Sequence, residues 1–205
     1  MIVPELHTVE IEGTTRAQFI LRGALATGAL YGVGAVAPYV SGAFGATATG
    51  DVQVLSFALA LEQLETAFYK AALARVALSD PIKKLATAFG AQEAEHAKAL
   101  SDLITQLGAK PAPAPTAKFG LTDQASFLKL AVTLEDTGIG AYNGAAPSIK
   151  TPDILTALGS IVQTEARHSA ALRTVAGQDP APQAFDKGLT PTQVNSAVQP
   201  FVQQA

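Results

Sequence analysis

Two segments of this 205-residue chain carry the same short motif, Glu-x-x-His. Glu93 and His96 form the first copy, and Glu165 and His168 form the second. Residues three apart in an α-helix lie on one face about a turn apart, so each copy can direct a carboxylate and an imidazole at the same point. Because the chain has only three histidines, two matches to this motif are improbable by chance.

A second pattern, a glutamate followed seven residues later by a tyrosine, also occurs twice. Glu62 precedes Tyr69, and Glu135 precedes Tyr142. Seven residues make two helical turns, so each tyrosine lies on the same helix face as its glutamate. The copies of this pattern are 73 residues apart, and the two Glu-x-x-His copies are 72 apart. The matching offsets predict an internal duplication of a helix pair.

Helix start and stop signals divide the middle of the chain into four long helices. Asp51 can cap the first, and Pro81 and Pro152 stand in the first turns of the second and fourth. Gly108 and Gly177 end these same two helices. The expected helices run from residue 51 to about 77, from 80 to 108, from 121 to 147 and from 151 to 177.

The connections between these helices predict how they are paired. Residues 110–115 alternate proline and alanine after a lysine, which makes a stiff, extended connection between two helical hairpins. No strand-like alternation is present, so we predict an all-α fold, a four-helix bundle over residues 49–177. An irregular all-α domain is the alternative. Residues 178–205 form a Pro/Gln-rich tail with one short helix after Thr190-Pro191.

The composition excludes several classes of function. The chain contains no cysteine, which excludes disulfides, thiolate metal sites and iron–sulfur clusters. Its formal net charge is −3 and it has no long basic run, so we expect no nucleic-acid binding. Hydrophobic residues make up 48% of the chain and aromatic residues only 6%, so the core must consist largely of alanine, leucine and valine.

Four carboxylates in such a core require compensating charge. Burying them ionised and unpaired would cost several kcal/mol each, or they would take up protons. Two divalent cations balance four glutamates and leave two histidines neutral. A carboxylate-rich set with one nitrogen per ion suits iron better than structural zinc, with manganese as the alternative metal. The expected ligands are Glu62, Glu93, His96, Glu135, Glu165 and His168.

This ligand pattern resembles that of the ferritin-like di-iron and di-manganese carboxylate proteins over residues 51–177. Within that superfamily the chain is most similar to exported bacterial ferritin-like-domain proteins related to desiccation-associated proteins. The resemblance implies that Glu93 and Glu165 bridge two ions. It also implies that Glu62 and Glu135, with the two histidines, are terminal ligands. The alternative is two helix-surface Glu–His contacts and two ordinary salt-bridged glutamates.

Other residues near this set have two interpretations each. Tyr69 and Tyr142 either orient the metal ligands through their hydroxyls or are core rings that bond any nearby carboxylate. Glu65 is either an extra ligand or a solvated charge, and we favour the solvated charge. The glycines of the third helix, which are costly in a helix interior, fit close packing against a neighbouring helix better than a small-molecule access path. They are Gly138, Gly140 and Gly144.

Residues 1–48 have the order of an export signal: a charged region, an apolar glycine-rich stretch and a small-x-small end at Ala46-Thr47-Ala48. Thr15-Arg16-Ala17 resembles the start of a twin-arginine motif, with Ala17 in the place of the second arginine. A membrane attachment through residues 19–44 is the alternative. We therefore expect a periplasmic, cell-envelope or extracellular protein.

Two classes of function fit these observations. The first is an oxidoreductase whose metals react with oxygen or peroxide, as a ferroxidase or in protection against oxidative stress. The second is a structural or stress-protective envelope protein in which the metals link the helices. A ferritin-type storage cage fits the export signal poorly. The sequence leaves open whether the chain forms a homo-oligomer.

Overall fold

The computed structural model describes residues 50–203, which are helical apart from connecting segments and one isolated antiparallel bridge between Ala117 and Val202. The predicted signal or anchor, residues 1–48, lies outside the described residues. No helix in the described part of the chain has the length and apolar character needed to cross a membrane. The helices are α3 (Asp51–Arg75), α4 (Asp80–Gln106), α5 (Gln124–Ala145), α6 (Pro152–Val175) and α7 (Pro191–Val198), with 3-10 turns η1 (Ala146–Ser148) and η2 (Gln199–Phe201).

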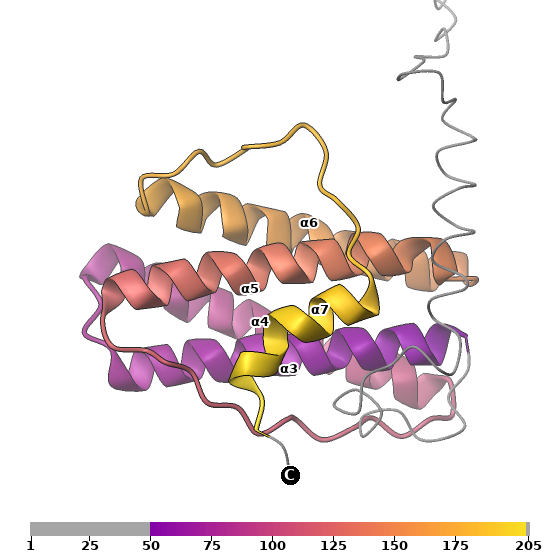
Figure 1. Ribbon diagram of the computed structural model, residues 1–205. Helices are drawn as coiled ribbons and strands as arrows, with labels where there is room; N and C mark the ends of the chain where they lie inside the picture. Colours follow the sequence, from indigo (N-terminus) through magenta and orange to yellow (C-terminus); the bar gives the residue numbers. More distant parts are fainter. Residues whose placement is uncertain (1–49, 204–205) are drawn as a thin grey trace, which may run out of the picture.

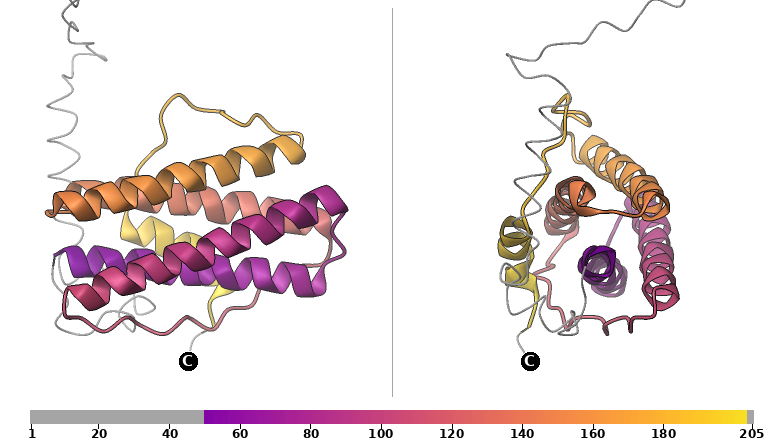
Figure 2. Two further views of the ribbon diagram at one scale, coloured as in Figure 1. Left: turned by 180° about the vertical axis from the view of Figure 1, so that it is seen from behind. Right: turned by 90° about the vertical axis from the view of Figure 1, so that its right-hand side faces the viewer.

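The four long helices form a bundle of two antiparallel hairpins (Figures 1 and 2). The first hairpin is α3–α4 and the second is α5–α6. The segment between α4 and α5 runs along the length of the bundle, so that α5 starts at the end opposite to the one where α4 stops (Figure 1). One long crossover of this kind is a feature of ferritin-like bundles. The predicted all-α bundle of two helix pairs is thereby confirmed.

Local signals set the ends of the helices close to the predicted residues. Asp123 caps α5: its carboxylate accepts from the N–H of Ser126, and the Ser126 hydroxyl accepts from the N–H of Asp123. Gly108 and Gly177 follow the ends of α4 and α6 with φ of 78° and 71°. This left-handed conformation is accessible to glycine at little cost, so the chain can turn away there.

Asp51 has a different role from the predicted one. Gly50 occupies the N-cap of α3, and the Asp51 side chain makes no cap hydrogen bond. Its carboxylate instead accepts from the backbone N–H groups of Lys150 at 2.8 Å and Thr151 at 3.0 Å. Because the helix starts at Asp51 itself, this carboxylate is free to reach the other hairpin. It therefore fastens the start of α3 to the start of α6.

The core consists of two apolar clusters, one toward each end of the bundle. Phe68, Phe89 and Phe127 belong to the cluster that fills the end where α3 meets α4. Leu59 and Leu100 belong to the cluster toward the opposite end. Between these clusters, at mid-length of the four long helices, lies a layer of buried acidic and histidine side chains.

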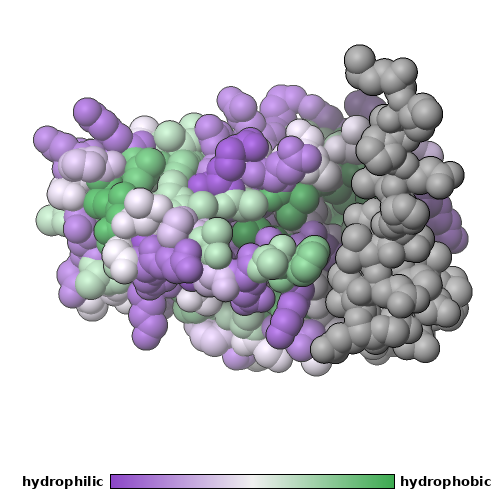
Figure 3. Space-filling model, turned by 90° about the horizontal axis from the view of Figure 1, so that it is seen from above, coloured by the Kyte–Doolittle hydropathy of each residue, from purple (hydrophilic) through white to green (hydrophobic). Residues whose placement is uncertain are grey.

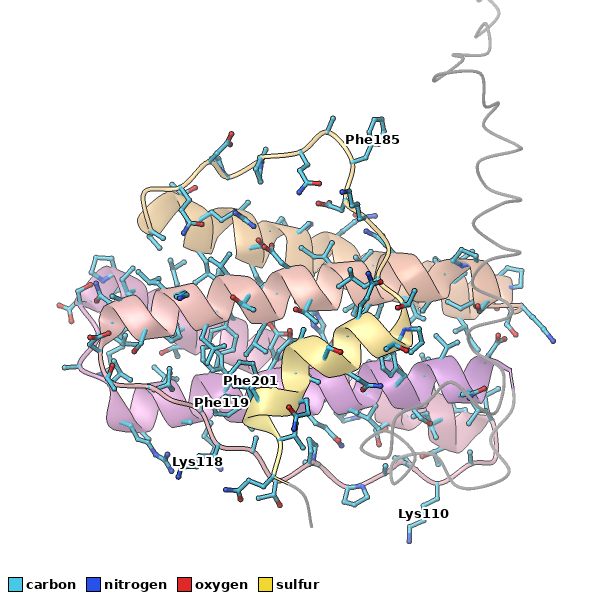
Figure 4. The ribbon with its side chains drawn as sticks, in the orientation of Figure 1. Lys110, Lys118, Phe119, Phe185 and Phe201 are labelled. Atoms are coloured by element: carbon cyan, nitrogen blue, oxygen red, sulfur yellow. The ribbon has the colours of Figure 1, made fainter. Side chains whose placement is uncertain are left out.

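The C-terminal tail is part of the packed structure. Helix α7 lies across α3 and α5 (Figures 1 and 2), and its Val194 and Val198 are 0% and 1% exposed. Beyond it, the backbone N–H of Lys118 donates to the carbonyl of Phe201 at 2.8 Å. The Phe201 ring lies against Phe119 of the crossover segment, with centroids 6.1 Å apart (Figure 4). The tail thus covers the α3–α5 side of the bundle.

Two glycines of α5 make room for this tail. A Cβ on Gly144 would lie 2.0 Å from the carbonyl oxygen of Leu189, and a Cβ on Gly140 would lie 2.5 Å from the Leu189 side chain. The Leu189 N–H donates to the carbonyl of Gly140 at 2.7 Å. Close packing was predicted correctly, but here the neighbour is the segment before α7 and not a long helix.

Candidate metal centre

The structure brings all six predicted ligands together at the centre of the bundle. Helices α3 and α5 each contribute one glutamate, and α4 and α6 each contribute a glutamate and a histidine one turn later. The set is Glu62, Glu93, His96, Glu135, Glu165 and His168. All are buried except His96, whose side chain is 14% exposed, compared with 2% for His168.

Three carboxylates converge on the imidazole of His96. Its Nδ1 lies 3.3 Å from Oε2 of Glu62, 3.0 Å from Oε2 of Glu93 and 2.9 Å from Oε1 of Glu165. Of these oxygens only that of Glu93 is aligned for a hydrogen bond. A ring nitrogen carries at most one hydrogen, so a single proton cannot satisfy three oxygens arranged in this way.

A second convergence, related to the first by the duplication, surrounds His168. Its Nδ1 lies 2.9 Å from Oε1 of Glu93, 3.4 Å from Oε2 of Glu135 and 3.8 Å from Oε2 of Glu165. Glu93 and Glu165 therefore turn one oxygen toward each histidine. Two groups of four residues result. The His96 group consists of His96, Glu62, Glu93 and Glu165, and the His168 group consists of His168, Glu93, Glu135 and Glu165. Within each group the ligand atoms all lie within 4.8 Å of one another.

The donor atoms fit two metal ions. Neighbouring ligands of a six-coordinate ion with bonds of about 2.1 Å lie about 3 Å apart, which matches the shorter nitrogen–oxygen distances above. Several of these atoms have no hydrogen-bond partner within residues 50–203. They are Oε2 of Glu62, Oε1 of Glu93, Oε2 of Glu135, both oxygens of Glu165 and Nδ1 of His168. Buried polar atoms without partners are rare, and one cation in each of the two groups would account for all of these.

Without a cation, the cluster holds protons in its place. Burial alone would lower the pKa of both imidazoles, but the surrounding carboxylates raise the pKa of His96 to about 12 and that of His168 to about 11. The same two imidazoles overcome the effect of burial on Glu165 and lower its pKa to about 2. Binding of metal ions would therefore release protons from the histidines.

The terminal carboxylates are affected in the opposite direction. Burial raises the pKa of Glu62 to about 8, and it raises the pKa of Glu135 well above its usual range, with Glu165 and Glu93 adding repulsion. These groups favour the neutral form until positive charge is placed near them. The charge of the site thus depends on what occupies it.

Both tyrosines interact with the cluster, but each reaches across to the other hairpin. The hydroxyl of Tyr69 on α3 donates to Oε1 of Glu135 on α5. The hydroxyl of Tyr142 on α5 donates in turn to Oε1 of Glu62 on α3. These two reciprocal bonds orient the terminal carboxylates and join the two halves of the duplication.

Glu65 is not the solvated charge that we favoured from the sequence. It is 4% exposed, and its Oε1 lies 3.2 Å from the point that a Cβ on Gly138 would occupy. Helix α3 is covered by its neighbours on almost every side in this stretch, so a face that would be solvated in a simpler bundle is buried. Burial, together with repulsion from the four clustered glutamates, raises the pKa of Glu65 well above its usual range. The absence of a side chain at the duplicate position, Gly138, was the signal that could have indicated this.

Sequence reasoning also missed two groups next to the ligands. The amide oxygen of Gln92 lies 2.6 Å from Nε2 of His168, and the Phe89 ring stacks on the same imidazole. Beside them, the Ser169 hydroxyl donates to Asp136 at 2.6 Å, and Arg173 forms an ion pair with Asp136 that links α6 to α5. No motif marked these residues, because their partners are far away in the sequence.

Comparison with known proteins agrees with this architecture. A family profile described as a ferritin-like domain matches residues 50–178. The chain belongs to this ferritin-like family. A crystal structure of a conserved hypothetical protein from Mycobacterium tuberculosis is similar in fold, with a TM-score of 0.56 and 19% sequence identity. The similarity covers 64% of this chain and 94% of that protein. No curated protein matches the chain.

Proposed function

We propose that this ferritin-like protein binds two iron ions, or two manganese ions, in its central cluster and uses them to react with oxygen or peroxide. The observation that supports this most strongly is the arrangement of Glu93 and Glu165. Each directs one carboxylate oxygen at the His96 group and the other at the His168 group. Carboxylates shared in this way, with one further glutamate and one histidine for each ion, suit a pair of oxygen-reactive metals.

In this proposal each residue has a separate task. Glu93 and Glu165 would contribute ligands to both ions, Glu62 and His96 would complete one position, and Glu135 and His168 would complete the other. The bound metals would supply one-electron redox chemistry and Lewis acidity. Tyr69 and Tyr142 hold the terminal carboxylates in place through their hydroxyls. The apolar clusters on either side keep bulk water away from the ligands.

The number of ligands supports a reactive site over a closed structural one. Each group offers four protein ligand atoms. Iron and manganese with oxygen-rich ligands commonly take six, so two positions on each ion would remain for water, oxygen or peroxide. His96, on α4, is the most exposed of the six ligands, so small molecules would enter from its side of the cluster.

The signal-like order of residues 1–48 supports export, to the periplasm, cell envelope or medium, as part of this proposal. In that setting a ferroxidase or peroxide-removing activity would protect the cell from oxidative stress. A structural role, in which the ions only fasten the four helices together, is the alternative that an experiment must separate.

The test is the metal content of the protein purified from its native source, measured by elemental analysis. We expect about two equivalents of iron or manganese per chain, as in other ferritin-like dinuclear centres. The double variant Glu93→Gln/Glu165→Gln should lose both. Glu95→Gln, an exposed position on the same helix as Glu93, is the matched control and should keep them.

Turnover then separates the two roles. Metal-dependent consumption of oxygen or peroxide by the wild type, absent from the double variant, would establish the oxidoreductase. A melting temperature that rises with metal, without any turnover, would establish the structural role. A wild-type protein that binds less than about a tenth of an equivalent even after incubation with Fe²⁺ or Mn²⁺ would contradict both.

A further inference from the structure

We propose that the two metal positions differ in affinity: the position beside His168 holds its ion more tightly than the position beside His96. The reason is that Gln92 and Phe89 fix the orientation of His168, while His96 has no equivalent support. This inference rests on the proposed function, because it concerns the same two ions. It adds Gln92 and Phe89 as positioning residues that the duplication does not repeat.

The first observation is the hydrogen bond between His168 and Gln92. With the amide oxygen of Gln92 as acceptor at 2.6 Å, Nε2 of His168 carries the hydrogen. The other nitrogen, Nδ1, faces Glu93, Glu135 and Glu165, and it is the one whose lone pair becomes available when a metal ion displaces its proton. Hydrogen bonds of this kind fix the tautomer and ring orientation of metal-binding histidines and make them better ligands.

The second observation is the packing of the two imidazoles. The ring of His168 stacks on Phe89, with centroids 4.0 Å apart and an angle of 26° between the planes. Its side chain is 2% exposed, compared with 14% for His96. Within the described part of the chain, Nε2 of His96 has no hydrogen-bond acceptor. The imidazole of His168 is therefore also supported on the sides away from the ligands, whereas that of His96 is held only through its Nδ1 and is partly exposed to water.

The third observation is that the residues at the duplicate positions of Gln92 and Phe89 differ from them. Adding the offset of the Glu-x-x-His copies, 72 residues, places Thr164 at the position of Gln92 and Ile161 at that of Phe89. Ile161 has no ring to stack. The Thr164 hydroxyl is engaged within its own helix, donating to the Ser160 carbonyl at 3.4 Å and accepting from Arg167 at 2.8 Å. The duplication thus repeats the ligands but not the residues that support one of them.

Outer residues that orient a metal-binding histidine commonly change metal affinity by 10- to 100-fold. Gln92 lies at the surface, where water competes for its amide, so the low end of that range applies. We therefore expect about a tenfold difference in dissociation constant between the two positions.

The experiment measures Mn²⁺ binding to single-position variants, with free Mn²⁺ quantified by electron paramagnetic resonance. His96→Ala keeps only the position beside His168, and His168→Ala keeps only the position beside His96. Repulsion between two bound ions then plays no part. We expect His96→Ala to bind Mn²⁺ about tenfold more tightly than His168→Ala. Equal dissociation constants would overturn the inference.

Gln92→Leu tests the cause. It should weaken Mn²⁺ binding about tenfold in the His96→Ala background and leave the His168→Ala background unchanged. Gln92→Glu, which keeps an acceptor for Nε2, should restore tight binding, whereas a merely structural role of Gln92 would not distinguish these two replacements. Thr164→Leu is the matched control at the duplicate position and should change neither background. An equal effect of Gln92→Leu in both backgrounds would overturn the role of Gln92.

The same measurement on the otherwise wild-type chain gives a second readout. Gln92→Leu should weaken the tighter of two Mn²⁺ dissociation constants and leave the weaker one unchanged. If the wild type binds two ions but Gln92→Leu shifts both constants equally, the inference of unequal support fails and the proposed function stands. If the wild type binds no Mn²⁺ and no Fe²⁺, the proposed function fails as well.

Discussion

Replacing Gly144 by alanine tests how the C-terminal tail is packed on the bundle. The added Cβ would lie 2.0 Å from the carbonyl oxygen of Leu189 and 3.0 Å from its nitrogen. Because both atoms belong to the backbone, no side-chain rotation relieves the overlap, and the whole segment before α7 must move. Overpacking of this kind costs up to about 3 kcal/mol. Alanine regains at most about 1 kcal/mol through its better helix propensity.

A shift of the tail on the bundle costs less free energy than its complete detachment. Val194 and Val198 of α7 are 0% and 1% exposed, and burial of a valine contributes about 1.5–3 kcal/mol each. Releasing α7 would therefore cost about 3–6 kcal/mol, more than the strain. We expect the tail to remain docked in a shifted position. The net loss in unfolding free energy is then about 2 kcal/mol, which corresponds to a melting temperature about 4–8 °C lower.

The matched control is Gly159→Ala in α6. This glycine is also in a helix, and a Cβ there would meet nothing within 4 Å. It should raise the melting temperature by about 2–4 °C, because only the propensity gain of about 1 kcal/mol remains. Thermal melts followed by circular dichroism, in protein with the same metal content, measure both changes. If Gly144→Ala were as stabilising as Gly159→Ala, the described packing of Leu189 on α5 would be wrong.

Three further perturbations follow from the contacts described above. Tyr142→Phe leaves Oε1 of Glu62 without its donor, so it should lower the unfolding free energy by about 1–3 kcal/mol and weaken metal retention, as measured by melting and elemental analysis. In Asp51, hydrogen bonds from the segment before α6 outweigh burial and lower the pKa below its ordinary value of 3.8. The contribution of the Asp51 carboxylate to the free energy of unfolding is therefore complete above pH 3.8 and is lost as the pH falls through the lowered pKa. Asp51→Asn should lower the free energy of unfolding by about 1 kcal/mol at pH 7, and the difference in stability between this variant and the wild type should shrink in melts below pH 3.8. A difference that stays constant with pH would refute this. Val198→Ala should cost about 2 kcal/mol in denaturant unfolding, whereas Phe185→Ala, at a site that is 76% exposed on a face of mixed polarity (Figures 3 and 4), should cost nothing measurable.

Local signals were sufficient to predict the helices and their order. The caps, prolines and glycines at helix ends act within a few residues, so their effect can be judged without knowing the neighbours. Gly108 and Gly177 end helices as expected, and Asp123 caps α5. Asp51 was misjudged because a carboxylate at a helix start has two partners to choose from, its own helix or another segment. Only the placement of α6 decides between them.

The packing of the tail was not predicted, and Glu65 was misjudged, for a related reason. Neither carries a periodic signal, and their burial depends on which surfaces the other helices leave uncovered. The valines of α7 fill the α3–α5 side of the bundle, and the absent side chain of Gly138 makes space for the Glu65 carboxylate. Contacts between residues more than 60 positions apart cannot be inferred from the local character of either partner.

The sequence by itself determined the four helices, their duplication and the six residues that meet at the centre. It could do so because ligands on a helix recur at a spacing that is set by the helix itself. The tertiary structure decided which oxygen of each carboxylate faces which histidine, and that each tyrosine bonds to the glutamate of the opposite hairpin. It also decided that Gln92 supports only His168. These distinctions depend on the height and rotation of one helix against another, which the packing of side chains fixes only when all four helices are in place.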